Sequence, residues 1–528
     1  MLPEIPQQLN IAEEFVSRPA REHPERTAIL GEPSRFSYSQ VEAAVNRAAN
    51  VLRECGCEAG ERVLIILPDS IEFIGAFFGA AKIGAIAVPV NSMARAADYS
   101  YYVKDAGARI AIVHVSAMEE FSRIEAAPEL RLLAISGEDA EDAVKAPGTV
   151  FAGARKLAWD DAWSKASERC GTHATAAMDP AFLLYTSGSG GTPKAAIHRH
   201  ADMVRTSRGY AREVLGLRAD DITYSVSKLF FAYGLGNGMY FPFSVGASTV
   251  LDPGKPKPER AADLLAKYRP TILFSVPTFF AAMLREAERG LAIDCSSLRM
   301  AISAGEALPA EIFERFKEKF RVEILDGIGS TEMLHMFLSP RPGRARAGSC
   351  GVEVPGCEAK IVDDEGCAIA DGAIGNLWVR GGGAFAGYWN KPELTARTKR
   401  GEWVVTGDKF TRDADGYHHY CGRADDMMKV AGMWVSPGEV ENALLGHPMV
   451  AEVAVVAQAN ENGLIHPAAY VVLKNEMQTQ EGLEREIREW LRQKLVSYKC
   501  PHTVQFVEKL PKTATGKIQR FRLRSSNH

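Results

Sequence analysis

The stretch YTSGSGGTPK, residues 185–194, is composed of glycines, small hydroxyl residues and one lysine, and it follows the apolar run AFLLY. Glycines let backbone N–H groups turn toward one point, and the hydroxyls of Thr186, Ser187 and Ser189 add further donors. Phosphate oxygens fit such a cradle, and Lys194 supplies a positive charge. A solvent-exposed turn is the alternative interpretation of an isolated run of glycine and serine.

The residues around the lysine differ from those of a Walker A loop. That loop has glycine before its lysine and serine or threonine after it, whereas Pro193 precedes Lys194 and Ala195 follows it here. The apolar residues AAI after the lysine predict a second strand where a Walker A loop begins a helix. The segment is therefore a candidate phosphate site of another type.

Two further stretches place polar residues where ligands bind in α/β proteins. SAGEALP, residues 303–309, ends a predicted strand and begins a helix, which is where open α/β sheets bind ligands. LDGIGSTEMLHMF carries Asp326, Thr331 and Glu332 in a predicted loop with two glycines. Glu332 is a candidate ligand of Mg²⁺, which prefers one or two carboxylates together with phosphate and water. The alternative is an exposed glutamate at a helix start, with Thr331 as its cap.

Acidic and basic residues recur toward the end of the chain. VVTGD places Asp408 at the predicted end of a strand, and GRADD contains Arg423 and Asp425. A carboxylate there is able to accept both hydroxyls of a ribose, although ordinary turn chemistry uses the same residues. Lys517 follows a glycine in PKTATGKIQR, a segment without apolar periodicity that is predicted to be a mobile turn. A basic tail of this kind is also typical of a solvated surface.

The elements that position these residues follow a βαβ rhythm. Apolar strand-like runs alternate with amphipathic stretches, which predicts parallel sheets covered by helices. The runs are residues 62–68, 108–115, 271–277 and 298–305, and ERAADLLAKYRP is a predicted helix. After about Val352 the pattern changes to short glycine-rich strands, typical of an antiparallel or barrel-like segment.

From about Asp426 the pattern is that of a compact α+β unit, with one strand predicted at MMKVAGMWV and helices at PGEVENALLGH and EGLEREIREWLRQKL. The prediction is an α/β protein with two domains. The large N-terminal domain, residues 1–424, contains two parallel-type βα layers and a small β-barrel-like part. A small mobile α+β domain follows at residues 425–528.

Composition limits the classes of partner. The chain has 528 residues, 46% hydrophobic and 24% charged, and 62 basic against 66 acidic residues leave a net charge of −4. No bulk field attracts nucleic acid or an anionic membrane, so we expect neither as a partner. The N-terminus has no basic region leading into an apolar one, and a cytoplasmic location is expected. The apolar window 73–90 contains Lys82 and Pro89, which favours a buried helix and a core strand over a membrane span.

The identity and order of six segments resemble those of the acyl-adenylate-forming superfamily, which includes acyl-CoA synthetases, adenylation domains of peptide synthetases and firefly luciferase. The segments are the glycine loop, GSTE, TGD, GRADD, KVAGMWVSPGEVE and PKTATGK. The resemblance covers nearly the whole chain. It implies ATP, Mg²⁺ and coenzyme A as cofactors or co-substrates.

The resemblance also implies roles for individual residues. Those near ATP or AMP would be Thr186, Ser187, Gly188, Ser189, Lys194, Gly305, Glu306, Asp326, Asp408 and Arg423. Thr331 would touch the α-phosphate and Glu332 would bind Mg²⁺. Lys517 would bridge the substrate carboxylate and the α-phosphate, neutralising two like charges that must meet.

In this family a carboxylate first attacks the α-phosphorus of ATP, and a thiol then displaces AMP from the acyl adenylate. Between the two steps the small domain swings about a hinge, which the resemblance places at Asp425. The strand around Lys429, Gly432 and Trp434 would then form a tunnel for pantetheine. Closure excludes water, which would hydrolyse the adenylate.

The phosphate loop departs from the family pattern at two positions. The family usually has SGSTG and later PKG, whereas this chain has Gly190 for the threonine and Ala195 for the glycine. Loss of one hydroxyl donor costs on the order of 1 kcal/mol when the backbone N–H groups stay in place. Ser189 and Thr192 are candidates to compensate.

The acyl pocket of the family is formed by the stretches matching SKLFFAYGLGNG and GIGSTEMLH. The residues that would surround the acyl group are Phe231, Ala232, Tyr233, Ser303, Gly327, Ile328, Gly329 and His335. Such a short, flat, apolar slot suits an aromatic ring. The two stretches resemble those of benzoate-CoA ligases and of ligases for aminobenzoates and hydroxybenzoates.

The preferred acid is left open between benzoate and its substituted relatives. Peptide synthetase domains for α-amino acids carry an aspartate in the first stretch, and FFAYGLGN has none. The neutral amino group of 2-aminobenzoate would need only an acceptor, for which Tyr233, Ser303 and His335 are candidates. Packing with one satisfied nitrogen is the alternative role of His335.

Two other functions are compatible with these motifs. A stand-alone aryl adenylating enzyme would load a carrier protein instead of CoA, and the benzoate-ligase character of the pocket argues against it. A nucleotide-binding regulator without catalysis is the second alternative, which Gly190 favours and the retained Lys194, Glu332 and Lys517 disfavour. The sequence makes no prediction about oligomeric state.

Overall fold

The computed structural model describes residues 4–32, 34–125, 127–145, 151, 153–187, 192–430, 433–459, 465–474, 482–512 and 518–524. The first of two large sheets has seven strands, parallel except for the last. In spatial order they are β7 (Arg155–Ala158), β6 (Leu132–Ser136), β5 (Ile110–His114), β3 (Arg62–Ile66), β4 (Ile86–Pro89), β8 (Pro180–Ser187) and β9 (Pro193–Arg199). Its central strands are buried on both faces, which explains their continuous apolar runs.

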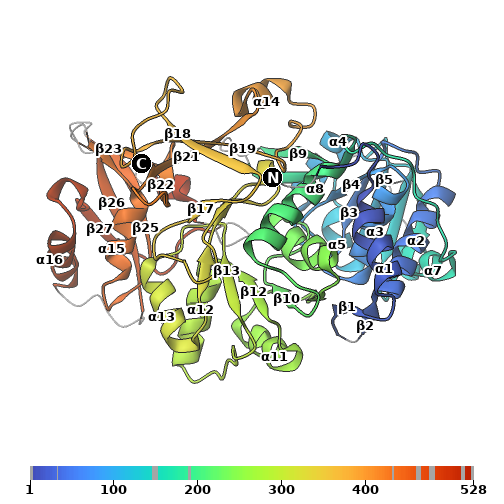
Figure 1. The fold of residues 1–528 in the computed structure, drawn as a ribbon, viewed down its shortest axis with the longest axis horizontal. Helices are drawn as coiled ribbons and strands as arrows, with labels where there is room; N and C mark the ends of the chain where they lie inside the picture. The colour runs from blue at the N-terminus through green and yellow to red at the C-terminus, as the bar shows by residue number, and fades with distance from the viewer. Residues whose placement is uncertain are drawn as a thin grey trace.

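The second large sheet also has seven strands, and only β2 runs antiparallel to its neighbour. Its order is β14 (Ile324–Asp326), β13 (Met300–Ser303), β12 (Ile272–Ser275), β10 (Ile222–Ser225), β11 (Ser248–Val250), β1 (Thr27–Leu30) and β2 (Arg35–Ser37). The βαβ rhythm of the sequence therefore forms two layers, as predicted. Figure 1 shows them beside each other, one mostly blue and the other green to yellow.

Helices cover both sheets. Those before β8 in the chain are η1 (Glu13–Ser17), α1 (Arg18–Glu22), α2 (Tyr38–Glu54), α3 (Ile71–Lys82), α4 (Ala96–Ala106), α5 (Val115–Phe121), α6 (Ala140–Lys145) and α7 (Trp159–Lys165). Those between β9 and β14 are α8 (His200–Thr206), η2 (Ser207–Val214), α9 (Ala232–Leu235), η3 (Gly236–Tyr240), α10 (Phe241–Val245), α11 (Pro258–Tyr268), α12 (Pro277–Glu288) and α13 (Ala310–Phe320). The apolar window 73–90 becomes α3 and β4, as predicted.

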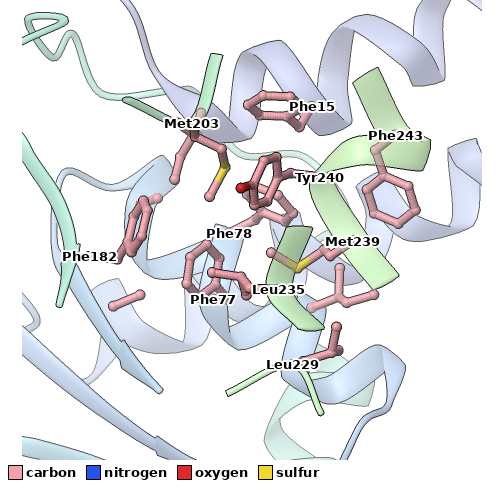
Figure 2. Close-up of a cluster of buried hydrophobic side chains, with 14 of the residues drawn as sticks. Phe15, Phe77, Phe78, Phe182, Met203, Leu229, Leu235, Met239, Tyr240 and Phe243 are labelled. Carbon is pink, nitrogen blue, oxygen red and sulfur yellow. The ribbon is translucent and has the colours of Figure 1, made fainter. Parts of the chain in front are cut away.

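One hydrophobic core joins the two layers. Phe77 and Phe78 of α3 pack with Leu235, Met239 and Tyr240 from the helices of the second layer (Figure 2). Helix α3 also packs directly against α2. At Gly79 the two helices are so close that an added Cβ atom would lie 2.9 Å from the Ala48 Cβ. The glycines and alanines of this apolar helix therefore serve close helix packing.

Antiparallel strands follow, as the glycine-rich texture predicts. A three-stranded sheet contains β15 (Ile328–Gly329), β16 (Met336–Ser339) and β17 (Val352–Glu353), and the 3₁₀ helix η4 (Thr331–Met333) lies between the first two strands. A five-stranded sheet contains β18 (Cys357–Val362), β19 (Gly375–Gly381), β20 (Lys399–Arg400), β21 (Trp403–Arg412) and β22 (His418–Arg423), with α14 (Pro392–Thr398) before β20. A common core that includes Phe337, Leu377 and Phe410 unites the two sheets.

The C-terminal domain is the α+β unit that the sequence predicts, drawn in orange and red in Figure 1. Its elements are β23 (Met428–Val430), β24 (Met433–Val435), α15 (Pro437–Leu445), β25 (Val450–Ala459), β26 (Ile465–Leu473), α16 (Leu483–Lys494), η5 (Ser497–Lys499), β27 (Thr503–Phe506) and α17 (Arg520–Arg524). The single strand predicted at MMKVAGMWV is wrong, because β23 and β24 are two strands that pair antiparallel. Within the described ranges, no helix combines the length and apolar character needed to cross a membrane.

Candidate active site

The predicted phosphate loop connects two antiparallel strands. Thr186 in β8 lies opposite Lys194 in β9, and Ser187 lies opposite Pro193. The strand predicted after Lys194 is thus present, which distinguishes the segment from a Walker A loop. Gly188 and Ser189 lie outside the described residues, as does Gly190.

Lys194 and Glu332 meet in a half-buried cluster with Tyr388. The Lys194 Nζ lies 3.1 Å from the Glu332 Oε1, and their side chains are 17% and 14% exposed. Lys194 also donates a hydrogen bond to the Tyr388 hydroxyl, and this hydroxyl donates to Glu332. Burial raises the pKa of Glu332, but Lys194 and the Tyr388 hydroxyl outweigh burial, and the net pKa is lowered. The carboxylate therefore stays ionised, as a metal ligand must be.

Glu332 is held by the backbone on both sides. Ser330 accepts a hydrogen bond from the Met333 amide at 3.3 Å and caps η4, so the predicted cap at Thr331 is wrong. The Glu332 carbonyl accepts a hydrogen bond from the Phe385 amide at 2.7 Å. Leu334 has a φ of 66°, a conformation that costs of order 1–3 kcal/mol in a residue other than glycine. This strained turn lies between Glu332 and His335, a predicted acyl-pocket residue.

Tyr388 is a site residue that sequence reasoning missed. Its segment runs along the free edge of β9: the Ala386 amide donates to the Ile197 carbonyl at 2.9 Å, and the Trp389 amide donates to the Ala195 carbonyl at 2.9 Å. This pairing places the Tyr388 hydroxyl beside Lys194. The available signal was the run GGGAFAGYWN, whose glycines allow close approach, but no spacing in it indicates a partner for the tyrosine.

Asp326 ends β14 at the carboxyl edge of the second sheet and is not in a loop as predicted. Ser303 at the end of β13 is its neighbour in the sheet. The Leu308 amide donates to the Asp326 Oδ2 at 3.3 Å, which brings the turn containing Gly305 and Glu306 close to the carboxyl group. Among the described residues, the Asp326 Oδ1 has no hydrogen-bond partner. This orphaned oxygen can accept a donor from a ligand.

Asp326 should make stability fall as pH rises. Burial raises its pKa from 3.8 to about 7, against smaller opposing effects of the Ser303 hydroxyl and the Leu308 amide. Below both pKa values the group is protonated in both states; as pH rises toward 7 the unfolded chain loses the proton first, so folding is progressively disfavoured. Replacing Asp326 by asparagine should remove this penalty, so that the variant gains about 2 kcal/mol of unfolding free energy relative to the wild type between pH 5 and pH 8.

The measurement is urea unfolding of the ligand-free protein at several pH values. Parallel pH dependences in the wild type and in Asp326→Asn would contradict the prediction. Asparagine keeps an oxygen that can accept the Leu308 amide hydrogen, so the substitution changes chiefly the ionisable group.

Asp408 and Arg423 form a second polar pair, in adjacent strands. They are register partners in β21 and β22, and the Arg423 Nη1 lies 3.0 Å from the Asp408 Oδ1. Asp408 lies within β21, so its predicted place at a strand end is wrong; Gly407, with a φ of 76°, bends the strand without ending it. Burial raises the pKa of the Cys350 thiol, and the charges of Asp326 and Asp408 raise it further, so both carboxyl groups lie near this thiol.

The predicted acyl residues Tyr233 and His335 lie together. The Tyr233 hydroxyl is 3.2 Å from the Ser275 carbonyl oxygen and 3.1 Å from that of Ile302, which places the ring over the carboxyl ends of β12 and β13. The His335 ring lies 5.4 Å from the Tyr233 ring, and its Nε2 is 3.1 Å from the Asn237 Oδ1. Asn237 was missed by the sequence analysis.

His335 keeps one nitrogen available. Burial lowers its pKa to about 3, so the imidazole is neutral at pH 7. In the described part of the chain, the His335 Nδ1 has no hydrogen-bond partner; the Ser303 hydroxyl meets no hydrogen-bond geometry but lies close enough to Asp326 to lower its pKa. Buried polar groups ordinarily have partners, so this nitrogen indicates where a ligand can bind.

The other predicted acyl residues divide into two groups. Phe231, Ala232 and Ile328 are half-buried. Gly327 and Gly329 have a packing role, because Cβ atoms on them would come within 2.4 Å of the Met336 sulfur and 2.5 Å of the His335 carbonyl oxygen. Their missing side chains let β15 approach β16.

The predicted thioester-forming face is described only in part. Lys429 and Trp434 are register partners in β23 and β24, and Asp425 is exposed in the turn before β23. Gly432 and Lys517 lie outside the described residues. The structure therefore does not place the predicted catalytic lysine.

Ala195, one of the two departures from the family pattern, is fully buried in β9. Its methyl group belongs to the core cluster that contains Leu183 and Val88. Alanine here adds apolar packing, and the neighbouring Lys194 keeps its contacts.

A cavity of about 460 Å³ lies beside Met333, the residue after Glu332. Met333, Thr206, Gly209 and Gly383 are among its lining residues, and none of the predicted acyl residues lines it. It is thus separate from the wall that contains Tyr233 and His335.

Two α/β layers, an α+β C-terminal domain and a lysine–glutamate pair at a glycine loop define a nucleotide-binding protein with a neighbouring aromatic-lined site. Comparisons with known proteins extend this. The family model described as AMP-binding enzyme matches residues 16–389, and the model of the AMP-binding enzyme C-terminal domain matches residues 439–517. The chain belongs to the AMP-binding enzyme family.

Its relatives cover the whole chain. A benzoate–CoA ligase of Thauera aromatica is 39% identical over 99% of this chain and 97% of its own length. The structure of the anthranilate CoA ligase AuaEII in complex with anthranoyl-AMP has a TM-score of 0.91 and 38% identity, and the match covers 99% of this chain and 98% of that one. A benzoate CoA ligase from Burkholderia xenovorans LB400 has a TM-score of 0.87 and 37% identity, over 98% of this chain and 100% of that one.

Proposed function

We propose that this protein is an ATP-dependent, AMP-forming aryl-CoA ligase that acts on an acid of the benzoate or 2-aminobenzoate type. The observation that carries the proposal is the aromatic wall formed by Tyr233 and His335, whose rings lie 5.4 Å apart. His335 follows Glu332 of the nucleotide site by three residues in the chain. An aromatic carboxylate bound against this wall would present its carboxyl group toward the phosphates. The relatives, which are named benzoate and anthranilate ligases, support the same substrate class.

Each end of ATP has a matching group of residues in this proposal. Thr186, Ser187, Gly188, Ser189 and Lys194 hold the β- and γ-phosphates. Gly305 and Glu306 flank the adenine, and the Asp326 Oδ1 accepts a hydrogen bond from the adenine amino group. Asp408 and Arg423 hold the ribose. Thr331 lies at the α-phosphate.

Glu332 fits a magnesium site. It is an ionised carboxylate next to a phosphate-binding lysine, and magnesium prefers one or two carboxylates combined with phosphate oxygens. When bound, the ion would supply positive charge that neutralises the charge developing on the leaving pyrophosphate. Lys194 would then exchange its contact with Glu332 for one with phosphate.

The reaction has two steps, formation of the aroyl adenylate and formation of the CoA thioester. A carboxylate oxygen of the acid attacks the α-phosphorus, the bond to the bridging oxygen breaks, and pyrophosphate leaves with the electron pair. Lys517 stabilises the charges that meet in this step. The CoA sulfur then attacks the aroyl carbon, AMP leaves, and the thiol proton is released.

The domain boundary belongs to the proposal. We place it between residues 424 and 425, with Asp425 as the hinge. β22 ends at Arg423, and the two family models leave the interval 390–438 between them. Rotation there would remove Lys517 and bring Lys429, Gly432 and Trp434 to the pantetheine tunnel. Free CoA as the acceptor and a cytoplasmic location complete the proposal.

The test is CoA-dependent AMP formation with ATP and Mg²⁺, across benzoate, 2-aminobenzoate, hydroxybenzoates, hexanoate and acetate. One aromatic acid should dominate by at least about tenfold in kcat/KM over hexanoate, because one or two misplaced apolar contacts cost that much. Lys517→Ala should be nearly inactive. Pyrophosphate release without a CoA thioester would indicate a carrier-protein acceptor, and no turnover with any acid would favour the nucleotide-binding regulator.

A further inference from the structure

A carboxylate outside the site connects both strands that flank the phosphate loop. Asp105 lies near the end of α4, and its side chain is 11% exposed. Its Oδ2 accepts a hydrogen bond from the Tyr185 hydroxyl at 2.8 Å. Tyr185 belongs to β8 and comes directly before the loop threonine Thr186.

The second flank is reached through a neighbouring tyrosine. The Tyr101 hydroxyl lies 3.0 Å from the Asp105 Oδ1 and 2.7 Å from the Pro193 carbonyl oxygen. Pro193 begins β9 and comes directly before Lys194. Asp105 and Tyr101 are one helical turn apart on α4, so one face of this helix contacts the entry and the exit of the loop.

The same carboxylate also contacts the segment that carries Tyr388. The Lys391 Nζ lies 2.9 Å from the Asp105 Oδ1. Burial, and next the charge of Asp105, raise the pKa of Tyr185 far above its usual value, so its hydroxyl remains a donor. The Asp105 carboxylate, which is largely buried, thus links α4 with β8 and with the segment after Tyr388, and through Tyr101 it also links α4 with β9.

We propose that Asp105 is a positioning residue for triphosphate binding, which holds the ends of the strands that carry Thr186 and Lys194 so that these two residues are in place for the β- and γ-phosphates. This inference rests on the proposed function only in that the loop binds ATP. Groups that are already ordered before binding lose less conformational entropy when they bind an anion. AMP has no β- or γ-phosphate, so its affinity should not depend on Asp105.

The experiment compares the affinities of the full-length protein for ATP with Mg²⁺ and for AMP, by titration calorimetry without acid or CoA. Asp105→Asn should weaken ATP binding about tenfold, because asparagine carries no charge and keeps only one of the two acceptor oxygens, and it should leave AMP binding within twofold. Tyr185→Phe should shift the same ratio in the same direction by a smaller factor, and it serves as the test when Asp105→Asn does not fold.

Two matched controls separate positioning from general stability. Asp160 is a partly buried carboxylate that accepts hydrogen bonds from Ser136 at 2.8 Å and from the Gly137 amide at 2.6 Å, away from the loop. Tyr99 lies on α4 itself and donates to the Asn91 carbonyl at 3.1 Å. Asp160→Asn and Tyr99→Phe should leave the ratio of ATP to AMP affinity unchanged.

Equal weakening of ATP and AMP by Asp105→Asn, or no change in either, would overturn the inference and assign Asp105 a purely structural role. A wild-type protein that binds ATP but forms no aroyl thioester would overturn the aryl-CoA ligase proposal alone. A wild-type protein that binds AMP and not ATP would overturn both.

Discussion

Replacing Glu332 by glutamine is expected to lower acid-dependent exchange of pyrophosphate into ATP by about 10²- to 10³-fold, the usual effect of removing one electrostatic contact to a transition state. Glutamine is nearly the same size but carries no charge. It would bind Mg²⁺ poorly, and it would leave Lys194 without the carboxylate that lies 3.1 Å away. The Tyr388 hydroxyl would donate to a neutral amide oxygen in place of a carboxylate, which is a weaker hydrogen bond.

The second half-reaction distinguishes this effect from unfolding. Formation of CoA thioester from a preformed aroyl adenylate releases no pyrophosphate, so Glu332→Gln should retain most of that rate. Glu61, a buried glutamate paired with Arg109 at 3.2 Å and Arg131 at 2.6 Å, provides the control variant Glu61→Gln. Exchange within threefold of the wild-type rate for Glu332→Gln would show that Glu332 does not act on the pyrophosphate-forming step.

Replacing Gly234 by alanine is expected to disrupt the aromatic wall formed by Tyr233 and His335. A Cβ atom there would lie 2.1 Å from the Lys228 carbonyl oxygen and 2.4 Å from that of Ser227. The backbone cannot retreat easily, because the Leu229 amide donates to the buried Asp69 at 2.9 Å and the Lys228 Nζ donates to the Asp252 carbonyl at 2.5 Å. Helix α9 would therefore shift, and Tyr233 with it.

We expect Gly234→Ala to lose about 1–3 kcal/mol of stability through overpacking. Because a shift of about 1 Å can cost about 10² in rate, kcat/KM for the aromatic acid should fall by roughly that factor, while KM for ATP changes little. Gly171, where an added Cβ atom would meet nothing within 4 Å, provides the control variant Gly171→Ala. Thermal unfolding and steady-state kinetics of both variants measure these two effects. If Gly234→Ala had the stability and the kcat/KM of the wild type, the packing argument would be contradicted.

Both experiments address residues that the sequence brought forward through motifs, but the interactions behind them are long-range. Glu332 was a candidate because of its place in GSTE, and Gly234 lies in FFAYGLGN, a stretch that was predicted to line the acyl pocket. Neither motif indicates that Tyr388 donates to Glu332 or that Asp69 secures the acyl segment. Such partners depend on how the two layers pack, which local spacing does not encode.

The sequence by itself determined the βαβ rhythm of both layers, the α+β character of the C-terminal domain and the strand after Lys194. Apolar periodicity and glycine positions are local properties, so they report on elements directly. They failed where a local signal was ambiguous. Asp408 was predicted at the end of a strand, although β21 continues through it, and MMKVAGMWV was predicted as one strand but forms two.

Only the tertiary structure decided which side chains share the site. Tyr388 meets Lys194 across 194 positions of sequence, and Lys391 meets Asp105 across 286. Asn237 reaches His335 across 98 positions. Each contact exists because two elements, each formed for local reasons, bury their apolar faces against a common core, and that packing brings distant polar groups within hydrogen-bond distance.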